Sequence, residues 1–314
     1  MATAIVFAYH DVGVRCLKVL LAQGVDVALV VTHQDNPAEN IWFDSVADVT
    51  REHGIPVSMP EDPNLPPTVE AITSVNPDFL FSFYYRHMIG PRLLASARHG
   101  ALNMHGSLLP KYRGRVPVNW AVIKGERETG ATLHYMLDKP DAGDIVDRQA
   151  VPILPDDTAV EVFRKVTVAA EIVLHRNLPS LLAGRAPRVP QVLAQGSYFG
   201  GRKPEDGRID WTGSAQAVHN LVRGVAPPYP GAFTTVSGKT VHILRSSRQP
   251  GRRGNFSAPT LFVEDNACFA QCADGSILRL VDMTLGGRRL EARDIARVLG
   301  PTPHPLLSES LSLT

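Results

Sequence analysis

The chain has 314 residues, 44% of them hydrophobic and 20% charged, which is an ordinary composition for a globular protein. This length suggests two domains, because a single hydrophobic core rarely grows beyond about 250–300 residues. The 32 Lys and Arg residues are matched by 31 Asp and Glu residues, so the formal charge of +1 disfavours a large nucleic-acid partner.

The cysteines and the apolar runs indicate the cellular setting. Cys16, Cys268 and Cys272 are too few for a disulfide framework, and Cys268 and Cys272 lack a second pair of ligands at zinc spacing. The first residues do not combine a charged head with an apolar signal core, and no apolar run approaches the ~18 residues of a membrane helix. We expect buried thiols, no metal, no membrane insertion and a cytoplasmic location.

The first half of the chain alternates between apolar strand-like runs and helical patterns. Strands are expected at residues 3–10, 25–33, 55–59, 77–85, from 100 onward, at 128–136 and in a run ending near 153. Helices are expected at residues 11–24, 45–53, 69–75, 93–97 and 158–182. This alternation predicts an α/β fold with a doubly wound, mostly parallel sheet.

The second half of the chain has a different pattern. Residues 184–208 are rich in Gly, Pro, Arg and Gln, which is typical of a linker. A helix at 214–225, a turn at 227–230, short strands at 232–244, 260–264, 268–273 and 276–281, and a helix starting near Ala292 follow it. We therefore expect a catalytic domain at 1–183, a linker at 184–208, a small barrel-like domain at 209–300 and a tail at 301–314.

The most informative stretch is residues 100–120, GALNMHGSLLPKYRGRVPVNW. On a strand Asn103 and His105 point to the same side, and burying such groups unpaired costs about 1–3 kcal/mol each. They either cap the end of the strand or form a site. Lys111, Arg113 and Arg115 follow on a constrained loop and favour a site for an anionic or polar ligand.

A distant carboxylate completes this pattern. Asp138, Asp141 and Asp144 lie on one turn without His or Cys at metal-ligand spacing, so solvated positions are favoured for Asp138 and Asp144. Asp141 follows the strand next in order to the central one and can reach His105, which suits acid–base chemistry. Asn103 then supplies the N–H donor that a developing oxyanion requires. The three residues predict acyl transfer without a protein nucleophile.

Several common motifs are missing from the sequence. There is no GxGxxG after the first strand and no GxxxxGK[ST], which disfavours nicotinamide and P-loop chemistry. Ser107 follows Gly106 without the second glycine of a nucleophile elbow, which disfavours a serine hydrolase.

LNMHGSLLPKYRG, followed by LDKPDAGDIV, resembles the signature of the 10-formyltetrahydrofolate-dependent formyltransferases. The resemblance continues through RGVAPPYPGA at 223–232. VFAYHDVG, THQDNP, FSFYYRHMI and LLPKYRGRVPVNW are most similar to the formyltransferase half of a bifunctional enzyme that acts on UDP-4-amino-4-deoxy-L-arabinose. This resemblance implies a Rossmann-like formyltransferase fold with a smaller OB-like domain, in a stand-alone form without the enzyme's second half.

The resemblance also implies roles for individual residues. The family's catalytic positions correspond to Asn103, His105 and Asp141. Its folate contacts correspond to His87, Met88, Ile89, Arg115, Leu137, Asp138, Lys139 and Pro140, and no metal is implied. The sugar-nucleotide neighbours would be residues 9–13, Tyr84, Arg86, Asn119 and Trp120, for which a packing or surface role is equally open.

The implied reaction moves a formyl group from the co-substrate 10-formyltetrahydrofolate to the primary amine of a UDP-linked amino sugar. UDP-4-amino-4-deoxy-L-arabinose is the closest match, which implies lipid A (lipopolysaccharide) modification and polymyxin resistance. The alternatives are methionyl-tRNA formyltransferase, formyltetrahydrofolate hydrolase and a non-catalytic folate or nucleotide-sugar sensor. The balanced charge argues against a tRNA substrate. The first strand begins at residue 3, without the preceding regulatory region that is usual in the hydrolase. The presence of Asn103, His105 and Asp141 argues against a non-catalytic sensor. The oligomeric state stays open.

Overall fold

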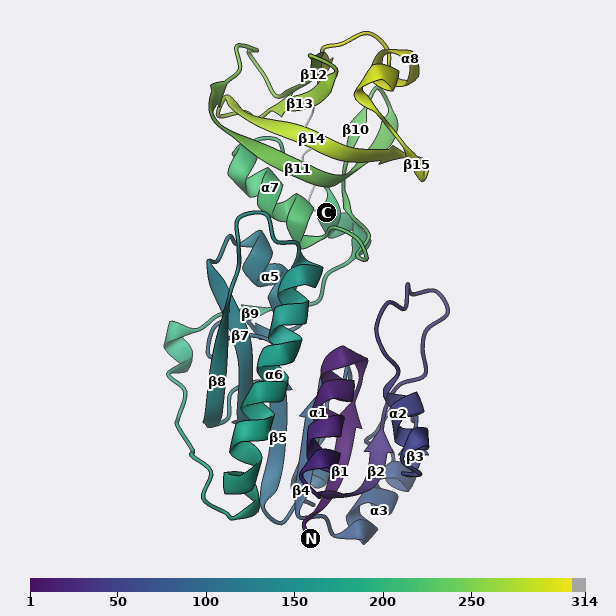
Figure 1. The fold of residues 1–314 in the computed structure, drawn as a ribbon, viewed down its shortest axis with the longest axis vertical. Helices are drawn as coiled ribbons and strands as arrows, with labels where there is room; N and C mark the ends of the chain where they lie inside the picture. The colour runs from purple at the N-terminus through teal and green to yellow at the C-terminus, as the bar shows by residue number, and fades with distance from the viewer. Residues whose placement is uncertain (307–314) are drawn as a thin grey trace. The chain divides into compact units, whose positions relative to one another are not determined.

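The computed structural model describes residues 1–306, which form two compact units (Figure 1). The first unit contains residues 1–118, 128–152 and 163–200. The second contains residues 119–127 and 153–162 together with the chain from residue 201 onward. Two short segments from within the first 183 residues therefore belong to the second unit.

The first unit is built on a seven-stranded sheet in the order β3-β2-β1-β4-β5-β7-β8. Strands β1 to β5 run parallel to one another, whereas β7 is antiparallel to both β5 and β8. The expected doubly wound, mostly parallel sheet is confirmed. The strands are β1 (Thr3–Ala8), β2 (Asp26–Val31), β3 (Val57–Ser58), β4 (Phe79–Phe83), β5 (Gly100–His105), β7 (Glu128–Tyr135) and β8 (Ile145–Pro152).

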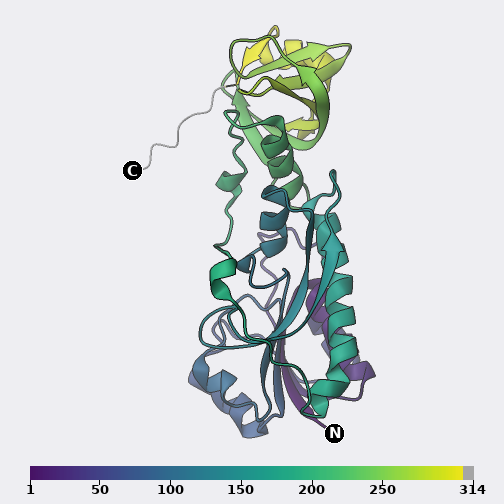
Figure 2. The ribbon, with the colours of Figure 1, turned by 90° about the vertical axis from the view of Figure 1, so that its left-hand side faces the viewer.

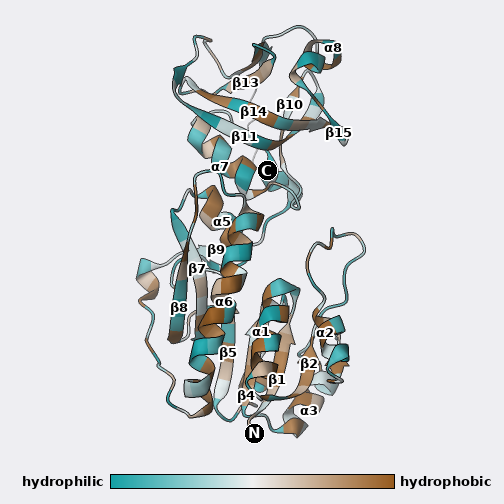
Figure 3. Cartoon of the chain, in the orientation of Figure 1, coloured by the Kyte–Doolittle hydropathy of each residue, from teal (hydrophilic) through white to brown (hydrophobic). Residues whose placement is uncertain are grey.

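Helices cover both faces of this sheet. On one face lie α1 (His10–Ala22) and the long α6 (Ala159–Leu182), joined by the Arg15–Glu171 ion pair at 2.6 Å (Figure 1). On the other face α3 (Pro66–Val75) and α4 (Pro91–Leu94) pack against β1 and β4. Helix α2 (Val46–Glu52) begins after Ser45, whose hydroxyl accepts the Asp48 N–H as an N-cap. Strands β1 and β2 are mainly hydrophobic, as two-sided burial requires (Figure 3).

The second unit is a curled antiparallel sheet in the order β10-β11-β14-β13-β12-β16 (Figure 2). This confirms the expected small barrel-like domain. Its core includes the fully buried Trp211. Its elements are α7 (Ala215–Gly224), β10 (Ala232–Val236), β11 (Lys239–Arg253), β12 (Thr260–Glu264), β13 (Ala267–Gln271), β14 (Ser276–Leu285), β15 (Arg288–Arg289), α8 (Ile295–Leu299) and β16 (His304–Pro305).

Some local expectations are wrong. The single strand expected at 232–244 is the hairpin β10–β11, because Ser237 and Gly238 take positive φ angles of 48° and 72° and turn the chain. Of the expected tail at 301–314, His304 and Pro305 pair with β12, and residues 307–314 lie outside the described residues. Cys16, Cys268 and Cys272 are buried free thiols, as expected.

Part of the expected linker is built into the first unit. Val189 pairs with Ile145 at the start of β8, and β9 (Tyr198–Phe199) pairs with β6 (Arg113–Gly114). Helix α5 (Pro117–Ile123), which the sequence analysis does not predict, follows β6. Across residues 1–306, the helices are all too short or too polar to cross a membrane.

Candidate active site

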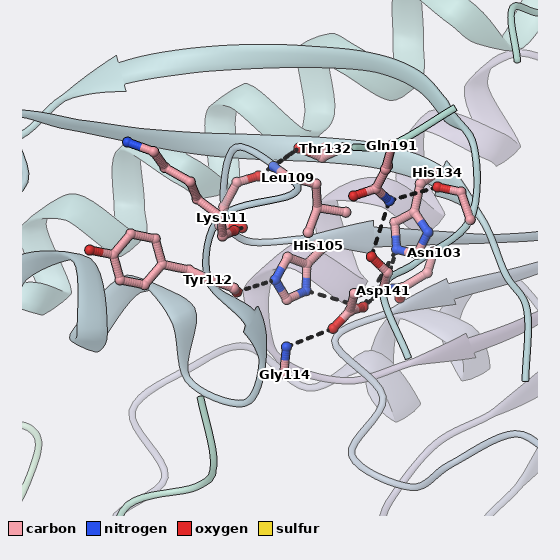
Figure 4. Close-up of polar contacts among 12 residues, drawn as sticks. Asn103, His105, Leu109, Lys111, Tyr112, Gly114, Thr132, His134, Asp141 and Gln191 are labelled. Atoms are coloured by element: carbon pink, nitrogen blue, oxygen red, sulfur yellow. Dashed lines mark hydrogen bonds and ion pairs between the residues drawn. The ribbon is translucent and has the colours of Figure 1, made fainter. Parts of the chain in front are cut away.

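The site is built on the end of β5, where it lies between β4 and β7. Asn103 is opposite Ser82 of β4 and His134 of β7, and His105 is opposite Thr132 of β7. Asn103 is half-buried and His105 is 6% exposed. As the alternation of a strand predicts, both side chains point to the same side, where they meet Asp141 (Figure 4).

Asp141 lies on the loop between β7 and β8, with a positive φ of 51°. Its Oδ1 atom lies 3.4 Å from both His105 Nδ1 and Asn103 Nδ2. Its Oδ2 atom accepts the Gly114 N–H at 2.8 Å. Burial alone raises the pKa of this carboxyl, but the neighbouring His105 and the Gly114 N–H lower it, and the pKa lies well below its usual range. Asp141 is therefore a carboxylate at neutral pH.

The ring of His105 is held from both sides. Its Nε2 atom lies 2.8 Å from the carbonyl oxygen of Tyr112, so Nε2 carries a proton and donates. Its Nδ1 atom faces the Asp141 carboxylate at the longer distance of 3.4 Å. The ring is thus anchored firmly through Nε2 and more loosely through Nδ1, which is the nitrogen better able to exchange a proton.

His134 is a site residue that the sequence analysis does not single out. Its Nδ1 atom donates to the Tyr135 carbonyl at 2.8 Å, so its Nε2 atom presents a lone pair toward Asn103 Nδ2 at 3.2 Å. Strand alternation within 128–136 puts Thr132 and His134 on one side, and this was the available signal. The antiparallel register of β7 with β5, which places His134 opposite Asn103, could not be read from the sequence.

The Asn103 amide nitrogen faces two protein groups. It lies 3.2 Å from His134 Nε2 and 3.4 Å from Asp141 Oδ1. These two atoms are 3.5 Å from each other, on the same side of the nitrogen. The two contacts fix the orientation of the amide at the end of β5.

The turn after β5 is fixed by hydroxyl groups. The Ser107 hydroxyl donates to the Lys111 carbonyl at 2.6 Å. The Thr132 hydroxyl donates to the Ser107 carbonyl at 2.6 Å and accepts the Leu109 N–H at 3.2 Å (Figure 4). Because Ser107 Oγ is committed to Lys111, it is not aligned with His105 as a nucleophile would be.

Comparison with known proteins identifies the family. The "Formyl transferase" family model matches residues 14–178, and the "Formyl transferase, C-terminal domain" model matches residues 202–300. The chain belongs to the formyl transferase family.

Solved structures share the fold of this formyltransferase. WlaRD, described as a sugar 3N-formyl transferase in the presence of dTDP and 5-N-formyl-THF, has a TM-score of 0.69 at 18% identity, covering 92% of this chain and 99% of that one. An N-formyltransferase from Helicobacter canadensis, in complex with folinic acid and dTDP-3-aminofucose, has a TM-score of 0.67 at 18% identity, covering 89% and 99%. HypX from Aquifex aeolicus, in complex with tetrahydrofolic acid, has a TM-score of 0.61 at 22% identity, covering 96% and 47%.

The residues expected to contact folate in this formyltransferase lie on exposed loops, with one exception. Ile89 is 5% exposed and packs in the core, so only its backbone is available to a ligand. Asn64 holds the surrounding loop, donating to the Met88 carbonyl at 3.0 Å and accepting the Gly90 N–H at 2.6 Å. Exposed or partly exposed positions are His87, Met88, Arg115, Leu137, Asp138, Lys139 and Pro140.

The expected sugar-nucleotide neighbours are divided between the two units. In the first unit Arg86 lies over the Tyr9 ring at 4.7 Å and binds Glu39, and His10 stacks on Phe43 at 3.9 Å. Asn119 and Trp120 belong to the second unit, where Asn119 donates to the Gly224 carbonyl at 2.9 Å. Across residues 1–306, no three His, Cys, Asp or Glu side chains are arranged to hold a metal ion.

Proposed function

We propose that this formyltransferase moves a formyl group from 10-formyltetrahydrofolate to the primary amine of a nucleotide-linked amino sugar, in the reducing cytoplasm. The observation that carries this proposal is the convergence of Asn103 and His105 on the single carboxylate of Asp141. This arrangement supports transfer between two bound substrates, because the Ser107 hydroxyl donates to the Lys111 carbonyl rather than to His105, and the reaction needs no acyl-enzyme.

The reaction follows from the roles of the three side chains. The acceptor amine attacks the formyl carbon, and the Asn103 amide N–H stabilises the oxyanion that forms. The proton lost by the amine passes through His105 Nδ1 to the folate nitrogen as its bond to the formyl carbon breaks. Asp141 stays ionised and balances the positive charge on the ring. The products are the formamide and tetrahydrofolate.

Two exposed apolar side chains support a folate position beside this group. Met88 and Leu137 are 58% and 56% exposed, although large apolar side chains usually gain by burial. Their neighbours Ile89 and Met136 pack in the same core cluster, which brings the two loops together. A flat pterin ring lying against Met88 and Leu137 would cover this apolar surface.

The acceptor we propose is UDP-4-amino-4-deoxy-L-arabinose, which would give the protein a part in lipid A modification. The support is the similarity of residues 32–37, 81–89 and 108–120 to an enzyme with that acceptor. Two of the similar structures contain dTDP or a dTDP-linked amino sugar, which favours a nucleotide-linked amine as the general class. The exposed Lys111 on the loop after β5 offers charge for a diphosphate.

A parallel acceptor assay tests this proposal. Purified protein and 10-formyltetrahydrofolate are incubated with UDP-4-amino-4-deoxy-L-arabinose, dTDP-linked 3-amino and 4-amino sugars, and methionyl-tRNA, and the formylated products are identified by mass spectrometry. The proposal expects the highest kcat/KM with the UDP-linked amine. A higher kcat/KM with a dTDP-linked amine would reject UDP-4-amino-4-deoxy-L-arabinose as the acceptor but would still support a nucleotide-linked amino sugar. Formylation of methionyl-tRNA alone would reject the class.

A further inference from the structure

Residues 189–199, here called the strap, run beside both loops that complete the site. At one end Val189 exchanges two backbone hydrogen bonds with Ile145, at 2.8 and 3.0 Å, just after the Asp141 loop. At the other end the Arg113 and Arg115 N–H groups donate to the Ser197 and Phe199 carbonyls at 3.0 and 2.9 Å. The strap is thus fastened to the loop that carries Asp141 and to the loop that contacts His105.

Gln191 of the strap holds the Asp141 loop. Its amide nitrogen donates to the carbonyl of Asp141 at 3.0 Å and to the carbonyl of Gly143 at 2.6 Å (Figure 4). These bonds brace a residue with a positive φ of 51°, a conformation that non-glycine residues rarely adopt. The Gln191 side chain therefore helps to keep the Asp141 carboxylate between Asn103 and His105.

The other end of the Gln191 amide shows that this contact is not optimised for stability. Its Oε1 atom is buried without a hydrogen-bond partner among residues 1–306. Rotating the amide would leave both carbonyls facing an oxygen, so the observed orientation is the only one that satisfies them. A buried unpaired oxygen is costly, and a role in shaping the site accounts for it.

Ser197 supports the position of His105, as Gln191 supports that of Asp141. Its hydroxyl accepts the Tyr112 N–H at 2.9 Å, and the Tyr112 carbonyl accepts from His105 Nε2 at 2.8 Å. Tyr112 has a positive φ of 57°, so this peptide also needs support. The strap therefore fixes the acceptor that sets the tautomer of His105.

We propose that the strap belongs to the catalytic apparatus, with Gln191 and Ser197 as positioning residues that act through Asp141 and His105. This inference rests on the proposed function, because positioning has a consequence only if the trio carries out the transfer. It gives residues with the composition of a linker a specific role in turnover.

The test is a double-mutant cycle on Gln191 and Asp141, read by single-turnover formyl transfer with enzyme in excess. Gln191→Met keeps the length of the side chain and removes both donors. Misplacing a catalytic group by about 1 Å can cost about 100-fold, so we expect Gln191→Met to slow transfer at least tenfold. In the Asp141→Asn background the same change should cost less than about threefold, because residues that act as a unit are not additive.

The control is Gln23→Met, which removes a comparable bond from Gln23 Nε2 to the His175 carbonyl, 2.8 Å long, and should leave the rate unchanged. A Gln191→Met rate within twofold of wild type, or an equal loss in both backgrounds, would overturn the inference. If Gln191→Met does not fold, Ser197→Ala measured alone and in a His105→Ala background decides by the same criteria, because Ser197 acts through His105. If Asp141→Asn alone retains the wild-type rate, the proposed function itself fails, and the inference fails with it.

Discussion

Asn103 and His134 face each other across β5 and β7, with their side-chain nitrogens 3.2 Å apart. Because His134 Nδ1 donates to the Tyr135 carbonyl, Nε2 can only accept from Asn103 while the ring is neutral. The histidine therefore helps to set which way the Asn103 amide points.

His134→Ala should slow formyl transfer and also lower the free energy of unfolding. Removing the 1% exposed ring leaves the Tyr135 carbonyl and the Asn103 N–H without this partner, which costs about 1–3 kcal/mol. The rate loss should largely disappear in an Asn103→Ala background, since both changes affect the same donor. Steady-state kinetics and urea unfolding check both effects, with the exposed His53→Ala as control. Equal rate losses in the two backgrounds would count against this role.

The meeting of Asn103, His105 and Asp141 could be predicted from sequence because it follows from strand alternation and strand order. Strand alternation puts Asn103 and His105 on one side, and the order of strands brings the Asp141 loop beside them. His134 and Gln191 could not be predicted in the same way, since their roles depend on an antiparallel register and on the return of a distant segment. The turn at Ser237 and Gly238 could not be predicted, because these two residues lie within a run of strand-forming residues.

Asp141 should make the stability of the protein depend on acidic pH. Its folded-state pKa is depressed below the value of about 3.9 for an unfolded aspartate, so its contribution is present above about pH 4 and is lost as pH falls through the folded pKa. Over that window this group lowers the free energy of unfolding by up to about 1.4 kcal/mol per pH unit of acidification.

Asp141→Asn should flatten this pH dependence, because the amide does not titrate. Denaturant unfolding of both proteins across the acidic range measures the effect. Asp138→Asn, a change at an exposed neighbour on the same loop, is unfolded in parallel as the matched control. Parallel curves for Asp141→Asn and wild type would show that this carboxylate is not stabilised in the fold.

Gly114→Ala should damage the site through the backbone. Gly114 has a φ of +96°, and an added Cβ would lie 2.2 Å from the Phe199 carbonyl oxygen, so β6 must move. That shift carries the Gly114 N–H away from Asp141. Gly24→Ala is the matched control, since Gly24 has a φ of +75° but open space around it. We expect both variants to lose stability and only Gly114→Ala to lose most turnover, and equal turnover in the two would contradict this.

Met88→Ala and Leu137→Ala should each raise the KM for 10-formyltetrahydrofolate. If the pterin covers these side chains, truncating one removes about 1 kcal/mol of apolar contact, or about a fivefold change. The KM for the amine should change much less. Val168→Ala removes a similarly exposed apolar side chain, 55% exposed, from α6 and serves as control. An unchanged KM for 10-formyltetrahydrofolate in both variants would show that Met88 and Leu137 do not contact the folate.

The most direct test of the account is the rate of formyl transfer to a nucleotide-linked amino sugar by the wild type and by the Asn103→Ala and His105→Ala variants. Circular dichroism and thermal unfolding show whether each variant keeps the fold. The account predicts transfer by the wild type and losses of about 10²–10³ in kcat for Asn103→Ala, the usual cost of one oxyanion donor, with at least as large a loss for His105→Ala. A folded His105→Ala or Asn103→Ala variant with near wild-type kcat would contradict it.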